Sequence, residues 1–365
     1  MNIGLITYQI EKSPGGVGVL VQNLVENIIQ LDKQNTYYLL HYMKSNNKIY
    51  GKNEILYRYY RYLPAMFSDS WYLYKHSDRF DVVHRFSPGG FIFKVKSKIV
   101  IGVNDLFLYK AYPFNRSSKI YLGRALNRSS LMKADAIIAI SQFTKEEILD
   151  TFPVDEKKVH VVYCAPNNLI KRSEMGKDMV SSKYGTASKY ILFVSTIEPR
   201  KNLLNLIRAY EILRERYFID ESLVVVGKKG WGYEKTLTYI ERSPSKNSIK
   251  LIGYVPTTDL GSLYSHASLF VYPSFMEGFG IPPLEAMKCG CPTLTSNTSS
   301  LPEVIGYPDM MFDPYDVNEI ANKCFAILKD PKVRNDNIEK GLKNVKRFSW
   351  RKSAEQIINI YHALQ

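Results

Sequence analysis

Short apolar runs alternate with longer stretches of helical periodicity along the whole chain. Residues 2–8 form an apolar run that predicts a strand, and apolar positions then recur every three or four residues from Val19 to Leu31, which predicts a helix. Further strands are expected at residues 37–42, 82–84, 99–103, 136–140 and 160–162. The hydroxyl of Ser141 is expected to cap a helix that begins there. Regular strand–helix alternation indicates an α/β fold with parallel sheets covered on both faces.

A second series of the same kind begins at Tyr190. Its expected strands are residues 191–194, 222–226, 249–251, 269–272 and 293–295, and its expected helices are residues 203–214 and 282–288. The polar stretch 167–189 lacks a core pattern and is the best linker candidate. We therefore predict two doubly wound domains with ligands bound at the carboxyl ends of the strands, facing a cleft.

Composition places the chain in the globular class. A length of 365 residues favours two domains, and 45% apolar with 23% charged residues excludes a disordered, collagenous or coiled-coil chain. No apolar run is long enough for a spanning helix, and the first residues are typical of a strand rather than a signal peptide. The four cysteines are too scattered for a disulfide framework or a zinc site. A cytoplasmic protein is expected.

Positive charge is concentrated in one segment. The chain carries a net charge of +14, and residues 52–133 contribute fifteen basic against five acidic residues, or +10. The same segment is rich in aromatic residues, as in the stretch 57–62. This combination favours a polyanion or an anionic membrane surface as partner. A solvated basic face that only aids solubility is the alternative.

The most specific motif spans residues 273–287, where a predicted strand gives way to a helix. Gly278 and Gly280 allow a tight turn and a close approach of the backbone to a ligand. Pro282 or Pro283 supplies a first helical residue without wasting a hydrogen-bond donor. The amides of the first helical turn are then expected to face the ligand.

Two glutamates belong to this motif. Glu277 stands in the loop and Glu285 in the expected first turn of the helix, eight positions later. Taken alone, Glu277 could face solvent and Glu285 could serve only as a partner of the helix dipole. Because the glycines and prolines accompany them, a ligand site is the favoured interpretation.

A second motif, residues 193–203, places two cations between a strand and the start of a helix. Arg200 and Lys201 could hold the oxygens of a diphosphate at that positive helix end. Two solvated loop cations are the alternative. Without a ligand, however, we expect their charge to be uncompensated, which favours an anion.

Two weaker motifs lie in the first domain. The glycine-rich loop 13–18 is not the dinucleotide fingerprint, but Gly16 would permit close approach to an anion. Asn104 and Asp105 follow the strand 99–103, and His84 ends the preceding strand. These polar residues are expected at strand ends that face the ligand, although a satisfied loop residue is the alternative for His84.

Over nearly its whole length the chain resembles retaining, nucleotide-sugar-dependent glycosyltransferases of the GT-B fold in glycosyltransferase family 4. The strongest signature is the pair of glutamates separated by seven residues, Glu277 and Glu285, with Gly278-Phe279-Gly280 between them. The resemblance implies an acceptor-side domain, a nucleotide-sugar-binding domain and a helix that returns to the first domain. Further resembling segments are 252–256, 259–264, 299–304 and 348–364. The expected bounds of the domains and the helix are 1–170, 171–345 and 346–365.

The resemblance also implies roles for matching residues. Glu277 would contact the donor-sugar hydroxyls, Arg200 and Lys201 would neutralise the diphosphate, Glu285 would bind the ribose, and the backbone of Val255 would meet the base. Asn104 stands where many members carry histidine, so an imidazole base is not expected there. The predicted catalytic residues are Glu277, Arg200, Lys201, Asn104 and Asp105. The predicted donor-binding residues are Gly16, Thr196, Gly227, Val255, Gly278, Phe279, Gly280, Ile281 and Glu285.

The donor, the acceptor and the alternatives complete the hypothesis. Residues 198–202 resemble branches that add mannose in polysaccharide biosynthesis, which favours GDP-mannose over UDP-linked hexoses. No metal or cofactor is expected, and the acceptor would be a glycan or a polyprenyl-diphosphate-linked chain at the membrane. A glycan phosphorylase of the same fold, often with a pyridoxal cofactor, and a nucleic-acid-binding protein are the other readings. The candidate acceptor or membrane residues are His84, Arg58, Arg61, Lys94, Lys96 and Lys98.

Overall fold

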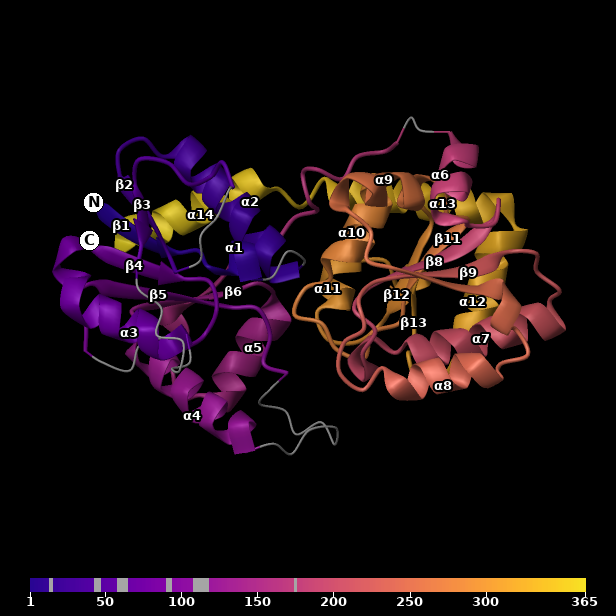
Figure 1. Cartoon of the computed structure of the whole chain (residues 1–365), viewed down its shortest axis with the longest axis horizontal. Coiled ribbons are helices and arrows are strands. Elements are labelled where there is room, and N and C mark those ends of the chain that lie inside the picture. Colours follow the sequence, from indigo (N-terminus) through magenta and orange to yellow (C-terminus); the bar gives the residue numbers. More distant parts are fainter. Residues whose placement is uncertain (13–15, 43–46, 58–64, 90–93, 108–117, 174–175) are drawn as a thin grey trace. The chain divides into compact units, whose positions relative to one another are not determined.

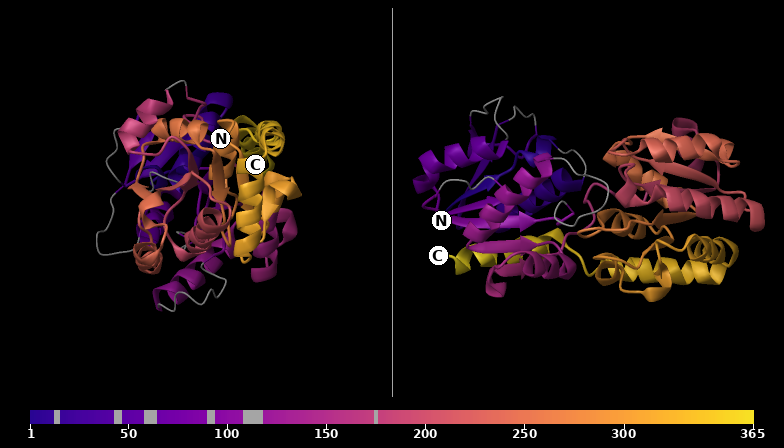
Figure 2. Two further views of the ribbon diagram at one scale, coloured as in Figure 1. Left: turned by 90° about the vertical axis from the view of Figure 1, so that its right-hand side faces the viewer. Right: turned by 90° about the horizontal axis from the view of Figure 1, so that it is seen from below.

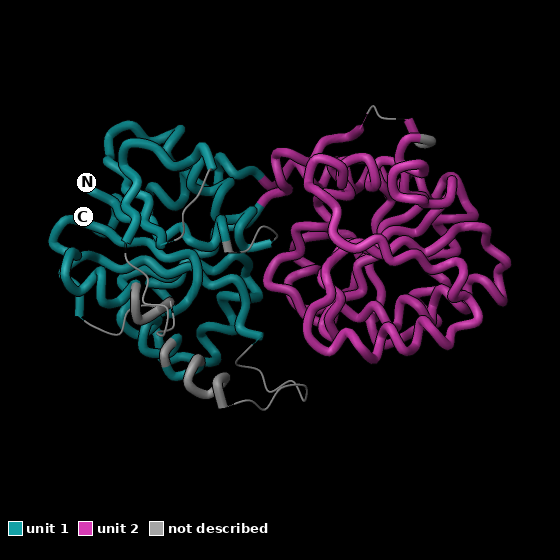
Figure 3. Tube along the Cα trace, viewed as in Figure 1, with its two compact units in different colours: residues 1–164, 349–365 teal, residues 165–348 magenta. Residues whose placement is uncertain are grey.

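The computed structural model describes residues 1–12, 16–42, 47–57, 65–89, 94–107, 118–173 and 176–365. Contacts divide it into two units, each built on a parallel sheet with helices on both faces (Figures 2 and 3). Unit 1 comprises residues 1–164 and 349–365, and unit 2 comprises residues 165–348. The predicted α/β class with two Rossmann-like domains is confirmed. The division falls between Cys164 and Ala165, whereas the sequence had placed it after residue 170.

The described strands of unit 1 form a parallel sheet in the order β3-β2-β1-β4-β5-β6-β7 (Figure 1). Central strands are buried on both faces, which explains why their sequences are almost continuously apolar. The edge strand β3 was not predicted, because it is short and exposed at both ends. The strands are β1 (Asn2–Ile6), β2 (Thr36–His41), β3 (Glu54–Leu56), β4 (Val82–Arg85), β5 (Lys98–Val103), β6 (Ala136–Ala139) and β7 (Val159–Val161).

The helices of unit 1 cover this sheet. The predicted cap is confirmed: the Ser141 hydroxyl accepts a hydrogen bond of 3.0 Å from the Thr144 amide. The α-helices are α1 (Gln9–Lys12), α2 (Gly16–Leu31), α3 (Ala65–His76), α4 (Ser118–Lys133), α5 (Gln142–Thr151) and α14 (Trp350–Ala363). The 3-10 turns are η1 (Ser77–Arg79) and η2 (Glu156–Lys158). None of the helices in the described parts of the chain is both long and apolar enough to cross a membrane.

The C-terminal helix α14 is fixed to unit 1 by packing and by one buried polar contact. It packs against α2, and its Ile357 and Tyr361 are fully buried. Tyr361 Oη lies 2.5 Å from Nδ1 of His84, the third residue of β4. Burial lowers the pKa of His84 to about 3, so its ring is neutral.

The described strands of unit 2 form a second parallel sheet in the order β10-β9-β8-β11-β12-β13. Side chains alternate between two cores: Ile191 and Phe193 of β8 pack toward α7, whereas Leu192 and Val194 pack toward α9. The two-residue strand β13 was not predicted. The strands are β8 (Tyr190–Val194), β9 (Ser222–Val226), β10 (Ile249–Gly253), β11 (Leu269–Tyr272), β12 (Thr293–Ser296) and β13 (Met311–Phe312).

The helices of unit 2 correct two predictions. Residues 177–184 of the expected linker form helix α6, which buries Val180 in the core. Helix α10 begins at Ile281, so Glu285 lies beyond its first turn. The α-helices are α6 (Lys177–Tyr184), α7 (Leu203–Arg216), α8 (Glu234–Arg242), α9 (Thr257–His266), α10 (Ile281–Lys288), α11 (Leu301–Ile305), α12 (Val317–Lys329) and α13 (Pro331–Val345). The 3-10 turns are η3 (Pro199–Lys201), η4 (Lys246–Ser248) and η5 (Pro308–Met310).

The buried contact of α14 gives the first prediction. His84 Nε2 has no hydrogen-bond partner among the described residues. In Tyr361→Phe, Nδ1 would lose its partner as well, so neither ring nitrogen would be satisfied. A buried polar group left unsatisfied costs about 1–3 kcal/mol. Urea unfolding should show a loss of this size. Tyr315→Phe, a change at an exposed ring, should match wild type. Equal stability of Tyr361→Phe and wild type would show that the contact adds nothing.

Candidate active site

The predicted donor-side residues gather at one edge of the unit 2 sheet. Arg200 and Lys201 follow β8, Gly227 follows β9, Val255 follows β10 and Glu277 follows β11. Since all these strands are parallel, their carboxyl ends share one edge of the sheet. The structure therefore brings together residues that lie up to 77 positions apart in the sequence, between Arg200 and Glu277.

A network of four charges, with Lys201 and Glu277 buried and Arg200 and Glu198 partly buried, forms the centre of the site. Lys201 Nζ donates to Glu277 Oε1 at 2.5 Å and to Tyr272 Oη at 3.2 Å. Arg200 NH1 lies 3.5 Å from Glu277 Oε2 and donates to the Met276 carbonyl at 3.0 Å. Arg200 Nε and NH2 both lie 3.0 Å from Glu198 Oε1. Two cations and two carboxylates thus form one neutral cluster.

This network corrects the expectation that the two cations are uncompensated. Burial alone raises the pKa of Glu277, but Lys201 and Arg200 outweigh it and hold that pKa at about 2. Burial lowers the pKa of Lys201, and the carboxylate of Glu277 opposes this shift. Glu277 is therefore an anion throughout the physiological pH range. The sequence had assigned no role to Glu198, because a carboxylate two residues from an arginine is a common pattern.

Three polar residues fix the loops that carry the network. Asn202 has a φ of +56°, a left-handed conformation that asparagine tolerates better than most residues, and its side-chain amide donates to the carbonyls of Pro273 and Pro314. The Glu277 amide donates to Ser299 Oγ at 2.9 Å, and Ser300 Oγ donates to the Glu277 carbonyl at 2.9 Å. The backbone of Glu277 is thus held on both sides. No spacing pattern in the sequence indicated these contacts.

Glu285 lies in a different environment on the same face of the sheet. It is buried, and its Oε2 accepts a hydrogen bond of 3.3 Å from Tyr264 of α9. Burial raises the pKa of Glu285 to about 7, against weaker opposing effects of Tyr264, the Asn167 backbone and Lys288. This carboxyl can therefore both donate and accept a hydrogen bond near neutral pH, which suits a hydroxyl-bearing ligand.

Two glycines at this edge are required by geometry. Gly227 has a φ of +147°, and a Cβ there would lie 1.8 Å from the Ser195 carbonyl oxygen. Gly280 has a φ of +97°, and a Cβ there would lie 2.6 Å from Leu301 Cδ2. At Gly227 the neighbouring backbone leaves no room for a side chain, and at Gly280 the positive φ is the conformation that favours glycine.

The remaining predicted donor residues differ in exposure. Val255, Gly278 and Phe279 are buried, and the ring of Phe279 packs edge-to-face on Phe348 with 5.5 Å between centroids. The ring of Phe279 is thus packed in the interior of unit 2 and does not lie on its surface. Thr196 is exposed and Ile281 is partly exposed.

The predicted residues of the first domain belong to unit 1. Gly16 is exposed and begins α2 with a φ of +32°. Asn104 Nδ2 donates to the Phe86 carbonyl at 3.2 Å, and Asp105 Oδ1 accepts from the Phe107 amide at 3.2 Å. Both residues follow β5, so they lie at the carboxyl edge of the unit 1 sheet.

The candidate acceptor or membrane residues do not form one group. The prediction that His84 contacts an acceptor or a membrane is corrected, because His84 is buried against Phe86 and Tyr361 and does not lie on the surface. Lys94, Lys96 and Lys98 are exposed, and Lys98 Nζ lies 3.2 Å from Asp135 Oδ1. Arg58 and Arg61 lie outside the described residues.

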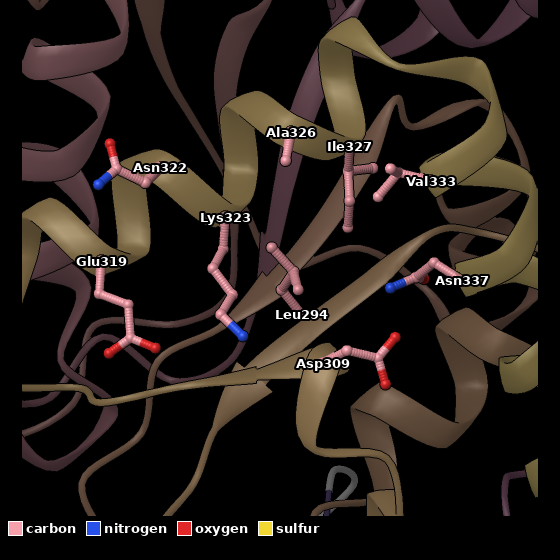
Figure 4. Close-up of a pocket in the computed structure, with 9 residues that line it drawn as sticks. All are labelled: Leu294, Asp309, Glu319, Asn322, Lys323, Ala326, Ile327, Val333 and Asn337. Carbon is pink, nitrogen blue, oxygen red and sulfur yellow. The ribbon is translucent and has the colours of Figure 1, made fainter.

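A pocket of about 380 Å³ lies elsewhere in unit 2 (Figure 4). It is lined mainly by α12 and α13, for example by Lys323, Ile327 and Asn337, and by no residue of the predicted site. Asn337 already bonds the backbone of Thr293, so it serves the fold. Among the described residues, no cluster of histidine, cysteine or carboxylate side chains could hold a metal ion.

Comparison with known proteins decides the family. Residues 176–344 match the family Glycosyl transferases group 1, and residues 14–167 match Glycosyltransferase Family 4. O-antigen chain mannosyltransferase B of Escherichia coli is 34% identical over 297 residues, which are 80% of this chain and 74% of that protein. The chain belongs to glycosyltransferase family 4. It is therefore a glycosyltransferase, as the two glutamates and their glycines had predicted.

Other relatives and solved structures agree with this assignment. Serotype-specific mannosyltransferase WbdA of Escherichia coli is 35% identical to this glycosyltransferase over 234 residues, 62% of this chain but 28% of that protein. The fold matches Anabaena HepE in complex with UDP and glucose, with a TM-score of 0.79, 17% identity and full coverage of both chains. It also matches WaaG, a glycosyltransferase involved in lipopolysaccharide biosynthesis, with a TM-score of 0.77, 14% identity and 99% coverage of both chains. The predicted GT-B fold is confirmed.

The raised pKa of Glu285 makes stability depend on pH. Because its folded pKa of about 7 exceeds the ordinary 4.5, the stability contributed by the protonated form is complete below pH 4.5 and is lost as the pH rises through 7. Without nucleotide, the free energy of unfolding of wild type should fall between pH 5 and pH 8.5 by on the order of 3 kcal/mol more than that of Glu285→Gln. Urea unfolding at both pH values measures this difference.

Because wild type and Glu285→Gln share all other titrating groups, the contributions of those groups to the pH dependence cancel in the comparison. Glu339→Gln, a change at an exposed carboxylate of α13, should follow the wild-type pH dependence. Parallel pH profiles for wild type and Glu285→Gln would show that Glu285 titrates normally.

Proposed function

We propose that this glycosyltransferase transfers mannose from GDP-mannose to a glycan acceptor in surface polysaccharide biosynthesis, with retention of anomeric configuration. The observation that carries the proposal is the 34% identity to a protein named O-antigen chain mannosyltransferase B, over 80% of this chain. Serotype-specific mannosyltransferase WbdA supports the same sugar over 62% of this chain. A UDP-sugar-dependent transferase is the alternative, and a glycan phosphorylase is a more distant one.

The charge network supports a mechanism of front-face attack. Departure of the nucleotide leaves positive charge on the sugar ring and additional negative charge on the diphosphate. Arg200 and Lys201 would stabilise the diphosphate, and preorganised charges in a buried site need little reorganisation. Glu277, a permanent anion, would accept hydrogen bonds from donor-sugar hydroxyls. The leaving phosphate oxygen would then take the proton of the attacking acceptor hydroxyl.

Neither a catalytic base nor a metal ion is part of this mechanism. Asn104 cannot take a proton, and its amide already donates to the Phe86 carbonyl. We assign it and Asp105 to the acceptor side on their position at the carboxyl end of β5 alone. Arg200 and Lys201 would donate hydrogen bonds to the diphosphate oxygens that a metal ion would otherwise contact. No cofactor is required, since the nucleotide sugar is the co-substrate.

The acceptor is proposed to be a glycan carried on a polyprenyl diphosphate at the cytoplasmic face of a membrane. The positive charge of residues 52–133 and the exposed Lys94, Lys96 and Lys98 support peripheral docking on anionic lipid. The exposed Trp71 and Tyr74 of α3 would add interfacial aromatic area.

A transfer assay tests the proposed function. Purified protein is incubated in EDTA with GDP-mannose, UDP-glucose or UDP-galactose and a mannose-terminated oligosaccharide, and the product is identified by mass spectrometry and NMR. We expect an α-linked product from GDP-mannose, with nucleotide release that does not require inorganic phosphate. Transfer from a UDP-sugar alone, or phosphate-dependent cleavage of the glycan, would replace the proposal by one of its alternatives.

Glu277→Ala is the matched variant for this assay. It should lower kcat about 10²-fold or more, the scale expected for losing one preorganised transition-state contact. GDP affinity should not fall, because Glu277 faces the sugar and its removal leaves the cluster of Arg200, Lys201 and Glu198 with a net positive charge. Glu339→Ala on α13 should match wild type. Equal losses of transfer and of GDP affinity would place Glu277 at the nucleotide instead.

Membrane docking is tested by sedimentation with liposomes. Each engaged cation contributes about 1 kcal/mol near an anionic surface. The protein should therefore sediment with anionic liposomes at low salt and be released from them at high salt. Joint charge reversal of Lys94, Lys96 and Lys98 should weaken sedimentation with phosphatidylserine vesicles and leave GDP affinity unchanged. Wild type that stays in the supernatant at low ionic strength would exclude docking and favour a soluble acceptor.

A further inference from the structure

The order of strands in unit 2 suggests how a nucleotide sugar lies along the sheet. Glu277 follows β11, and Arg200 and Lys201 follow the neighbouring strand β8. If the proposed function holds, the sugar lies at β11 and the diphosphate at β8. The groups of a nucleotide sugar are joined in the order sugar, diphosphate, ribose and base. The base would therefore extend past β8 toward the next two strands, β9 and β10. Glu285 fits this direction, because it bonds Tyr264 of α9, the helix that follows β10.

The backbone at the ends of β9 and β10 is built to aim one side chain. The Gly227 amide donates to the Gly253 carbonyl at 2.7 Å, and both glycines have a positive φ, +147° and +73°. The pairing of β10 with β9 shifts register between Leu251 and Gly253, which marks a bulge. Bulges occur next to active sites, where they redirect the following side chain. Here the following side chain is Tyr254.

Tyr254 is an exposed aromatic ring on a fixed backbone. Its residue is 52% exposed, although the next residue, Val255, is buried in the core that also contains Tyr264. Lys228, one residue after Gly227, places its Nζ 4.7 Å from the centroid of the Tyr254 ring. A ring and a cation therefore stand together at the sheet edge toward which the base extends.

We infer that Tyr254 and Lys228 form the nucleobase site and give it a preference for guanine. The Tyr254 ring stacks on the base, an interaction that any base can make and that a larger purine makes over more area. The Lys228 ammonium donates hydrogen bonds to O6 and N7 of guanine, two acceptors that lie side by side. Uracil has no counterpart of N7, so the same lysine discriminates against it.

The chain supplies a control for each residue. Lys229 is the next residue after Lys228, is also exposed, and lies over a different ring, that of Tyr233, at 5.3 Å. Tyr315 is 64% exposed and stacks on Phe275 in the loop that follows β11, with 4.7 Å between centroids. A general effect of charge or of exposed aromatic area would act on these residues equally.

Isothermal titration calorimetry with GDP, UDP and inorganic pyrophosphate, at one salt concentration, tests the inference. Tyr254→Ala should weaken GDP binding about 10-fold, the scale of one base–aromatic stack, and leave pyrophosphate binding unchanged. Tyr254→Phe should keep GDP affinity, because the ring is retained. Lys228→Met should weaken GDP more than UDP. Lys229→Met and Tyr315→Ala should match wild type for all three ligands.

Each contrary outcome has a separate meaning. Wild-type GDP affinity in Tyr254→Ala would overturn the stacking site while leaving the proposed function intact. Equal losses of GDP, UDP and pyrophosphate in Lys228→Met would assign that lysine to the diphosphate and overturn the guanine preference. Equal effects of Lys228→Met and Lys229→Met would show that Lys228 acts only through a non-specific electrostatic effect, and would overturn its role in base recognition. Wild type that binds no nucleotide would overturn the proposed function as well as the inference.

Discussion

The buried contact between Lys201 and Glu277 is the interaction on which the rest of the site depends. Taking two charges out of water costs several kcal/mol for each ion, and the pair is tolerated only where the geometry is good and further polar partners are present. Here Tyr272 supplies a partner to the lysine, and Arg200 stands 3.5 Å from the carboxylate. The loops after β8 and β11 therefore cannot move independently. Asn202 reinforces this constraint, because its amide bonds the loops after β11 and β13 at once.

The two glutamates of one short motif differ in charge because their surroundings differ. Glu277 faces two cations and has a pKa of about 2, whereas Glu285 faces a tyrosine hydroxyl in the core and has a pKa of about 7. The two side chains are chemically identical, so their surroundings alone separate their protonation states. A permanent anion suits a fixed set of sugar hydroxyls. A carboxyl that titrates near neutrality costs stability when ionised, and a bound ribose hydroxyl would offset part of that cost.

Periodicity was sufficient to predict most of the fold. Central strands such as β8 are buried on both faces and are therefore apolar throughout, so the sequence identifies them directly. Short edge strands escaped prediction: β3 has one partly buried residue, and β13 has two residues. Helix α6 also escaped, because only Val180 of its residues 177–184 reaches the core as a fully buried apolar side chain.

The site was predictable only in part, for a different reason. Glu277, Glu285, Arg200 and Lys201 stand in recognisable motifs, but the contacts that these motifs make with one another and with distant residues are not visible in the sequence. Asn202 meets Pro314 across 112 residues, and Lys201 meets Tyr272 across 71. Such pairs follow from the tertiary fold rather than from spacing. They also change the electrostatic argument: the four-charge cluster is neutral, so a diphosphate adds negative charge to a site without net positive charge. Its binding must then depend on sharing Arg200 and Lys201 with their carboxylates, and on cations beyond the cluster.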